Sequence, residues 1–180
     1  MKIACIGWGS LIWRPENLPI QHKWFDDGPI LPVEFTRQSS DDRITLIIDE
    51  QAKPVRTLWT LMMTTELDQA IIALKEREGA KKVDVIHSVT TSTENATGVK
   101  GEILKWIKTL NLDAAIWTGL SYSDKTNKER PTLEYVINHL KNLQHNKRKH
   151  AEEYIRKAPK QIDTEYRRQI EFTLGWTHQD

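Results

Sequence analysis

A short apolar strand that stops at two glycines limits the folds open to this chain more than any other feature. Residues 2 to 6 show no polar alternation, as expected for a strand whose two faces are both covered. Gly7 and Gly9 then allow backbone angles and close approaches that a side chain would forbid. A glycine turn leaving a strand can point several N–H groups at one place, which makes a cradle for an anionic or oxyanionic group. The same residues also suit an ordinary tight turn at a strand end.

The pattern along the chain predicts an α+β fold, in which the strands of the sheet come first in the sequence and the helices are concentrated in the C-terminal half. Strand-like segments follow at 32–38, 43–49, 55–63, 83–89 and 114–118, and the pair within 32–49 indicates a hairpin. Strands in such close succession favour an antiparallel or mixed sheet. Helices are expected from a threonine cap at Thr64 to Glu78, from about Val99, after Thr132, around 151–157, and from Asp163 to Gly175.

The length of 180 residues, without an internal repeat or a linker, predicts one domain spanning residues 1–180. Apolar residues make up 38% and charged residues 28%, the balance of a soluble globular protein. No apolar run approaches the roughly 20 residues that cross a bilayer, and no signal-peptide cleavage site is evident. The single cysteine, Cys5, is predicted to be an inert core thiol. Together these features predict a cytoplasmic protein.

The helix expected to stop at Gly79 carries a carboxylate in an unusual place. Four residues share one face of it, within about 60° of one another: Leu67, Ile71, Leu74 and Glu78. A carboxylate buried without a full set of partners has a raised pKa, which is the tuning that a general acid or base needs. The alternatives are that Glu78 reaches solvent at a frayed helix end, or that it pairs with an arginine, for which the candidates are Arg37, Arg43 and Arg56.

Other common catalytic patterns are incomplete. The six histidines show no ligand spacing and Cys5 has no partner cysteine, so we expect no metal site. Ser10 lacks the second glycine of a nucleophile elbow, and no histidine and aspartate partners are evident, which makes a serine hydrolase a poor alternative. The glycine run also lacks the lysine and the length of a phosphate-binding loop.

The segment Gly7–Pro15, with the sequence Gly-Trp-Gly-Ser-Leu-Ile-Trp-Arg-Pro, resembles the opening motif of the gamma-glutamylcyclotransferase-like superfamily. It is most similar to the bacterial ChaC-type branch. Residues 35–37 and 43–46 resemble the next two strands of that family. Trp59 and the helix that ends in Arg77-Glu78-Gly79 resemble the segment that carries its catalytic glutamate. The motifs lie within residues 1 to 90, and beyond them only the general layout is similar.

The resemblance implies a mixed, barrel-like sheet and an enzyme that cyclises a gamma-glutamyl compound to 5-oxoproline with release of the amine. The substrate would be glutathione, a gamma-glutamyl peptide or a gamma-glutamylamine. It implies that Glu78 is the general acid/base and that the backbone amides of Gly9, Ser10 and Leu11 bind the gamma-glutamyl group. No metal or organic cofactor is needed for this reaction. Nucleophile and electrophile belong to one molecule, so the site has mainly to fold the substrate into an attack geometry.

Trp8 departs from the family pattern, because tyrosine usually stands at this position. Indole has an N–H donor but no hydroxyl group and no acceptor. Trp8 is nevertheless predicted to contact the substrate, and it is a candidate, with Trp13 and Trp59, to wall the pocket. Tyr122 is a weaker candidate for the contacts that the family makes further along the chain.

Two other functions stay open. The missing tyrosine hydroxyl allows a non-catalytic protein of the same fold that binds a gamma-glutamyl metabolite. The stretch from Leu140 to Arg168 contains nine lysines or arginines against four acids, so its net charge is +5, and it could touch RNA or an acidic protein. No aromatic interleaving or known motif accompanies these charges, which favours a solvated helical face. The oligomeric state is left open.

Overall fold

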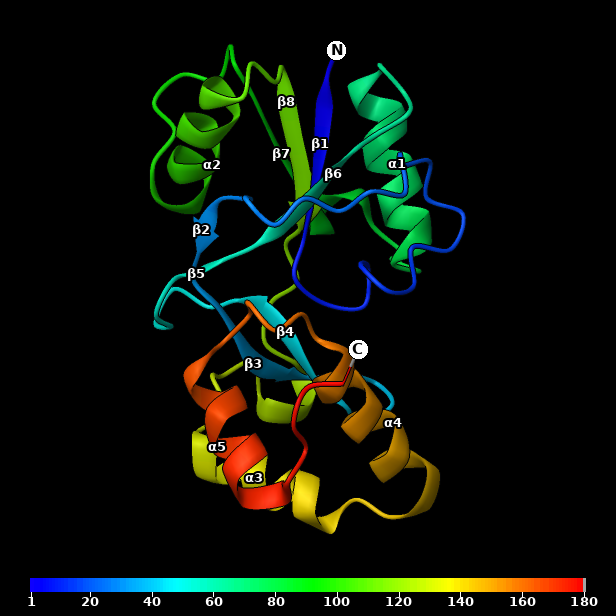
Figure 1. Cartoon of the computed structure of the whole chain (residues 1–180), viewed down its shortest axis with the longest axis vertical. Helices are drawn as coiled ribbons and strands as arrows, with labels where there is room; N and C mark the ends of the chain where they lie inside the picture. Colours follow the sequence, from blue (N-terminus) through cyan, green and yellow to red (C-terminus); the bar gives the residue numbers. More distant parts are fainter. Residues whose placement is uncertain (180) are drawn as a thin grey trace. The chain divides into compact units, whose positions relative to one another are not determined.

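The computed structural model describes residues 1–179, which form two compact units built from alternating stretches of the chain. Unit 1 contains Met1–Gly7, Arg14–Leu31 and Arg56–Leu120, and unit 2 contains Trp8–Trp13, Pro32–Val55 and the chain from Ser121 onward. The chain therefore passes between the units at 7–8, 13–14, 31–32, 55–56 and 120–121. Each unit combines strands with helices (Figure 1), which confirms the α+β class.

Unit 1 is built on a four-stranded mixed sheet in the order β6-β1-β8-β7. Its strands are β1 (Ile3–Gly7), β6 (Leu58–Leu61), β7 (Ile86–Thr90) and β8 (Ala114–Thr118). β1 pairs antiparallel with β6 and parallel with β8, while β7 pairs antiparallel with β8. All residues of β1 are buried, which confirms the prediction that both of its faces are covered.

Two helices pack on this sheet, α1 (Leu67–Arg77) and α2 (Gly98–Thr109), and Figure 1 shows them on opposite sides of it. α1 begins later than predicted, because the Thr64 hydroxyl accepts from the Glu66 N–H in the preceding turn and does not cap the helix. Gly79 has a φ of +61°, which confirms the left-handed residue expected just after this helix.

Two strands are shorter in the structure than the apolar pattern of the sequence predicts. The segment 55–63 splits into β5 (Val55–Arg56) and β6, because the N–H and the hydroxyl of Thr57 both donate to the carbonyl of Pro29. β5 and the two-residue strand β2 (Ile30–Leu31) form a separate pair. The segment 83–89 begins with a 3-10 turn, η1 (Val83–Val85), and only then becomes β7. Apolar runs of this length do not distinguish the two conformations.

Unit 2 is built on the hairpin of β3 (Val33–Gln38) and β4 (Ile44–Ile48), which pair antiparallel as predicted. A β-bulge between Phe35 and Arg37 shifts their register. The 3-10 turn η2 (Asp124–Thr126) and three helices follow: α3 (Leu133–Asn142), α4 (His145–Lys157) and α5 (Glu165–Leu174). In unit 2, α5 contacts β3, α4 contacts β4, and α3 contacts α5.

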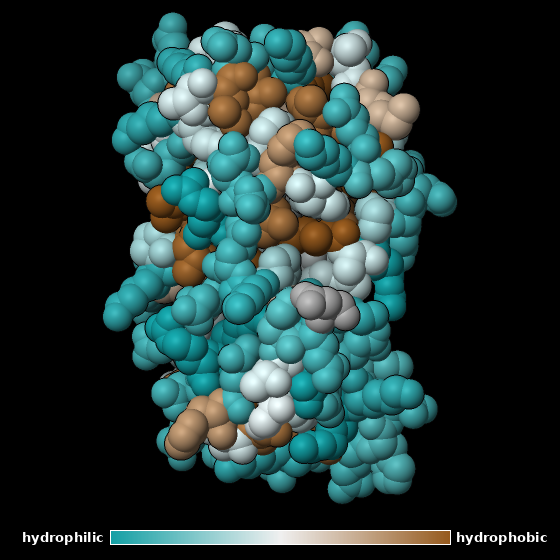
Figure 2. Space-filling view, viewed as in Figure 1, coloured by the Kyte–Doolittle hydropathy of each residue, from teal (hydrophilic) through white to brown (hydrophobic). Residues whose placement is uncertain are grey.

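The helix ends of unit 2 follow their sequence signals with one exception. The side chains of Thr132 and Thr164 cap α3 and α5 by accepting backbone N–H bonds, and the left-handed Gly175 ends α5 as predicted. α4 begins at His145, six residues before the predicted start at Ala151. The prediction missed residues 145–150 because they are hydrophilic and have no apolar stripe. They form the exposed surface of the first turns of the helix, and hydrophilic side chains cover most of this unit in the view of Figure 2.

A buried carboxylate joins β3 to the start of α5. Glu34 is 2% exposed, and its carboxylate accepts from the Thr164 hydroxyl and from the Tyr166 N–H, the latter at 3.1 Å. The Phe35 N–H donates to the same carboxylate at 2.8 Å. Burial raises the pKa of Glu34, although these hydrogen bonds act in the opposite direction. Glu34 therefore fixes the N-terminus of α5 against the hairpin.

We predict that Glu34→Gln destabilises the chain in a pH-dependent way. A raised folded-state pKa means that the protonated carboxyl contributes stability below its ordinary pKa of 4.5, and that this contribution is lost as the pH rises through the folded-state value. The variant should therefore lose most at acidic pH, by about 1–3 kcal/mol for a disrupted buried hydrogen-bond set. Urea unfolding followed by tryptophan fluorescence measures the difference across the pH range.

The matched control is Glu165→Gln, which changes an exposed glutamate in the first turn of the same helix. It should leave the unfolding free energy nearly unchanged. A Glu34→Gln deficit that stayed constant between acidic and neutral pH would contradict the assigned direction of the Glu34 pKa.

Candidate functional site

The glycine turn after β1 is fixed on the hairpin of unit 2 by its tryptophan. The Trp8 Nε1–H donates to the carbonyl of Leu46 at 3.3 Å, and Trp8 is 5% exposed. Within the turn, the Ile12 N–H donates to the carbonyl of Gly9 at 3.0 Å, while Ser10 is half-buried. The predicted residues Gly9, Ser10 and Leu11 therefore belong to one ordered turn.

Tyr154 of α4 holds the other side of this turn. Its hydroxyl oxygen accepts from the Leu46 N–H at 3.3 Å, so both polar groups of the Leu46 residue are bonded to side chains. A Cβ atom at Gly9 would lie 2.5 Å from this hydroxyl oxygen, closer than real Cβ contacts allow. The Tyr154 ring also packs edge-on against Trp13 and Phe35. Glycine is thus required at position 9 because the Tyr154 hydroxyl lies so close to it, and not because of its backbone angles.

Glu78 lies at the C-terminal cap of α1 in unit 1, immediately before Gly79. Its side chain is 16% exposed and pairs with the Arg77 guanidinium at 2.5 Å. Arg77, which is 8% exposed, also donates from Nε and Nη2 to the carbonyl of Arg14 at 3.2 and 2.7 Å. Glu78 therefore does not extend into solvent, and its partner is the adjacent arginine and none of the three considered from the sequence.

The charges of Glu78 and Arg77 both affect the thiol of Cys5 in β1. Burial strongly raises the pKa of Cys5, the charge of Glu78 raises it further, and the charge of Arg77 lowers it. Both charges are thus close enough to β1 to act on a fully buried group. Burial places Cys5 in the core, as predicted, and by raising the pKa it favours the protonated, unreactive thiol.

The other sequence candidates have structural contacts of their own. Trp59, in unit 1, stacks on Phe25 and donates its Nε1–H to Asp27 at 2.8 Å. Tyr122, in unit 2, donates to Asp49 at 3.0 Å, and burial together with that carboxylate raises the pKa of Tyr122 to about 12. These bonds hold loops in place.

Sequence reasoning missed Tyr154 and Arg77 as parts of the site. Tyr154 shares the buried face of α4 with Ala151 and Ile155, a spacing typical of a helix interior, but it lies in a stretch interpreted as basic and polar. Arg77 was visible only as the neighbour of Glu78, because residues adjacent on a helix usually point in different directions.

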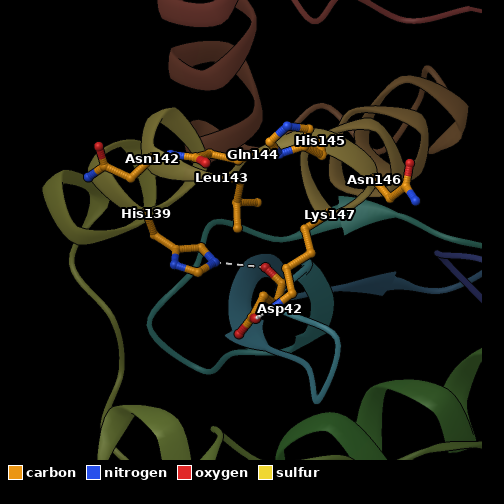
Figure 3. A pocket seen from close by; sticks show the side chains of 8 residues that line it. All are labelled: Asp42, His139, Asn142, Leu143, Gln144, His145, Asn146 and Lys147. Atoms are coloured by element: carbon orange, nitrogen blue, oxygen red, sulfur yellow. Dashed lines mark hydrogen bonds and ion pairs between the residues drawn. The ribbon is translucent and has the colours of Figure 1, made fainter.

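A separate pocket of about 540 Å³ lies in unit 2, where α3 and α4 meet the tip of the β3–β4 hairpin (Figure 3). His139 bonds to the Asp42 carbonyl at 2.7 Å, and the Asp42 carboxylate pairs with Lys125 at 2.5 Å and Lys147 at 2.6 Å. Hydrogen bonds from Lys125, Lys147 and Gln38 lower the pKa of Asp42 well below its usual range. None of the predicted site residues lines this pocket.

Several charges of the basic stretch Leu140–Arg168 stabilise the fold of unit 2. Arg167 is 2% exposed and donates to the carbonyls of Ala158, Pro159 and Ile162. The Arg148 guanidinium lies 5.1 Å from the centre of the Trp176 ring. The lysines of this stretch are exposed, most of them on helices and Lys160 in the turn between α4 and α5, as expected for a solvated face.

The comparisons with known proteins add no assignment. The chain matches no protein-family model, and the search of curated proteins found no significant match. Within residues 1–179, no helix is both long and apolar enough to cross a membrane. The same residues contain no group of three or more histidine, cysteine, aspartate or glutamate side chains placed to hold a metal ion.

We predict that Gly9→Ala destabilises the chain by about 1–3 kcal/mol, the usual cost of forcing an extra methyl group into a packed region. The cost arises from the Tyr154 hydroxyl, so it should fall by more than half in a Tyr154→Phe background. A double-mutant cycle on unfolding free energies measures this coupling. Additive costs for the two substitutions would show that the hydroxyl does not restrict the residue at position 9.

We also predict that Asp42→Asn lowers the melting temperature at neutral pH, and that this effect starts to shrink only as the pH falls below the ordinary carboxyl pKa of 3.8. A lowered folded-state pKa contributes stability above the ordinary value of 3.8, and this contribution is lost as the pH falls. Asparagine tolerates the positive φ of +68° at this position, so the backbone should not change. Calorimetry from neutral pH down to the lowest pH at which the chain stays folded tests the prediction, and a deficit that does not shrink anywhere below pH 3.8 would contradict it.

Proposed function

We propose that the chain is a gamma-glutamylcyclotransferase-like enzyme, which converts a gamma-glutamyl compound to 5-oxoproline and releases the amine. One observation carries the proposal: the Glu78 carboxylate is largely buried at the end of α1, where Arg77 holds it. β1 leads directly into the turn that contains Gly9, Ser10 and Leu11.

In the proposed mechanism, Glu78 takes a proton from the substrate ammonium group, which makes the α-amine a nucleophile. The amine attacks the gamma-carbonyl carbon of the same molecule, and the backbone N–H groups of Gly9, Ser10 and Leu11 stabilise the charge on the carbonyl oxygen. Each such donor is worth about 3 kcal/mol where it has been measured. Glu78 then gives its proton to the leaving nitrogen as the C–N bond breaks. The products are 5-oxoproline and the free amine.

The contacts of Arg77 support a positioning role in this mechanism. Arg77 bonds both the Glu78 carboxylate and the Arg14 carbonyl, so it restricts the rotamers that the carboxylate can adopt. A general base must be held within hydrogen-bond reach of the proton that it removes. The proposal therefore assigns Glu78 to proton transfer and Arg77 to its orientation.

The hydrogen bond of Trp8 limits what this residue could contribute to substrate binding. Its only polar hydrogen is donated to Leu46, so its contribution to substrate binding would come from the indole ring. The barrel-like form of the sheet is a further part of the proposal that rests on the family resemblance, and the cytoplasmic location and the single domain rest on the sequence. A non-catalytic protein that binds a gamma-glutamyl metabolite is the second candidate, favoured by this use of the Trp8 donor.

The test is to measure 5-oxoproline release by mass spectrometry with glutathione, gamma-glutamyl dipeptides and gamma-glutamylamines. We predict product from at least one class, and a loss of at least about 100-fold in kcat for Glu78→Gln. Glutamine has the size of glutamate and still accepts from Arg77 through its amide oxygen, so the fold should persist.

Glu76→Gln is the matched control, since Glu76 is an exposed glutamate on the same helix. It should retain full activity. Full activity in Glu78→Gln would contradict the proposed chemistry. Binding of a gamma-glutamyl compound without product from any class would favour the non-catalytic candidate.

A further inference from the structure

Arg37 of β3 is a half-buried cation with almost no hydrogen bonds. Its Nη1 donates to the carbonyl of Gln38 at 3.4 Å, which is near the limit for a hydrogen bond. Its Nε is buried and has no partner in the part of the chain that the structure describes. No carboxylate among residues 1–179 lies within ion-pair distance of its guanidinium group.

Other arginines of unit 2 have acceptors for their charge. Arg43, on the same hairpin, also has a buried Nε without a hydrogen-bond partner in the described part of the chain, but this Nε forms an ion pair with Asp41 at 2.7 Å. The Arg43 guanidinium also lies above the Tyr154 ring. Arg130 donates to Asp49 at 2.7 Å and to Tyr166 at 2.9 Å. Arg37 thus differs from Arg43 and Arg130 in having no carboxylate within ion-pair distance.

A buried donor without an acceptor is costly, and it is more costly when the group is charged. Burial lowers the pKa of Arg37, and the charge of Asp124 offsets this only in part. Natural proteins rarely leave such a group unsatisfied unless a water, an ion or a ligand supplies the acceptor. The missing partner of Arg37 is therefore an anion or another strong acceptor from outside the chain.

We infer that Arg37 binds a carboxylate group of a ligand. One planar guanidinium matches one carboxylate in charge and geometry. Arg37 is the register partner of Thr45, the residue next to Leu46, whose backbone holds Trp8 and Tyr154. It thus belongs to the hairpin that carries the glycine turn. If the proposed function is correct, on which this identification rests, the carboxylate is the α-carboxylate of the gamma-glutamyl group.

The test is a titration of the whole chain with 5-oxoproline, observed through the arginine Nε–Hε signals in ¹H–¹⁵N NMR spectra. We expect a saturable shift of the Arg37 signal and no shift of the Arg43 signal. The carboxamide of 5-oxoproline differs only in lacking the carboxylate, and it should bind at least 10-fold more weakly. Acetate, as a simple carboxylate, should shift the same Arg37 signal at higher concentration.

Arg37→Lys keeps the positive charge but loses the planar pair of donors, and it should weaken 5-oxoproline binding at least 10-fold. Arg43→Lys is the matched control and should bind as the unaltered chain does. If the Arg37 signal of the unaltered chain responds to neither 5-oxoproline nor acetate, the inference is overturned, whatever the variants show.

The same experiments separate this inference from the proposed function. A chain that releases 5-oxoproline, and whose KM is unchanged by Arg37→Lys, would overturn the inference and leave the proposed function in place. A chain that releases no 5-oxoproline, but whose Arg37 signal shifts with acetate, would support the carboxylate site and contradict the proposed function.

Discussion

The bonds to Leu46 in the β3–β4 hairpin organise the region around the glycine turn. Its carbonyl accepts from the Trp8 indole and its N–H donates to the Tyr154 hydroxyl, so a side chain from the turn and one from α4 meet at one residue. A lone two-stranded hairpin is only marginally stable in water, and it needs such packing against other elements. The same arrangement places the Tyr154 hydroxyl where a side chain at Gly9 would lie, and this contact explains why glycine stands there.

The Glu78 carboxylate depends on a different set of interactions in unit 1. A helix end leaves carbonyl groups without intrahelical partners, and a left-handed glycine is a common way to finish it. Gly79 ends α1 in this way, and Arg77 bonds both the carboxylate and the Arg14 carbonyl. The result is an acidic side chain that is ordered, largely buried and close to β1.

Much of the fold could be predicted from the sequence, because local patterns determine it. β1, the β3–β4 hairpin and the ends of α1 and α5 follow from apolar runs and from Gly79 and Gly175. The break at Thr57 could not be predicted, because it depends on hydrogen bonds to the distant Pro29. The full length of α4 could not be predicted either, because its first turns are exposed and have no apolar pattern. The exchange of chain between two units also leaves no linker in the sequence. Glu78 could be identified from its helical spacing, but its partner Arg77 and the contact of Tyr154 with Gly9 required coordinates.

In the function proposed above, Glu78 and the backbone amides of Gly9–Leu11 act on the same small molecule. A crystal structure of the chain with bound 5-oxoproline tests this claim most directly. We expect the ligand carbonyl oxygen to accept from the amides of the turn, with the Glu78 carboxylate within hydrogen-bond distance of the ring nitrogen. A complex in which 5-oxoproline binds elsewhere, or contacts the turn while Glu78 lies beyond reach, would contradict it.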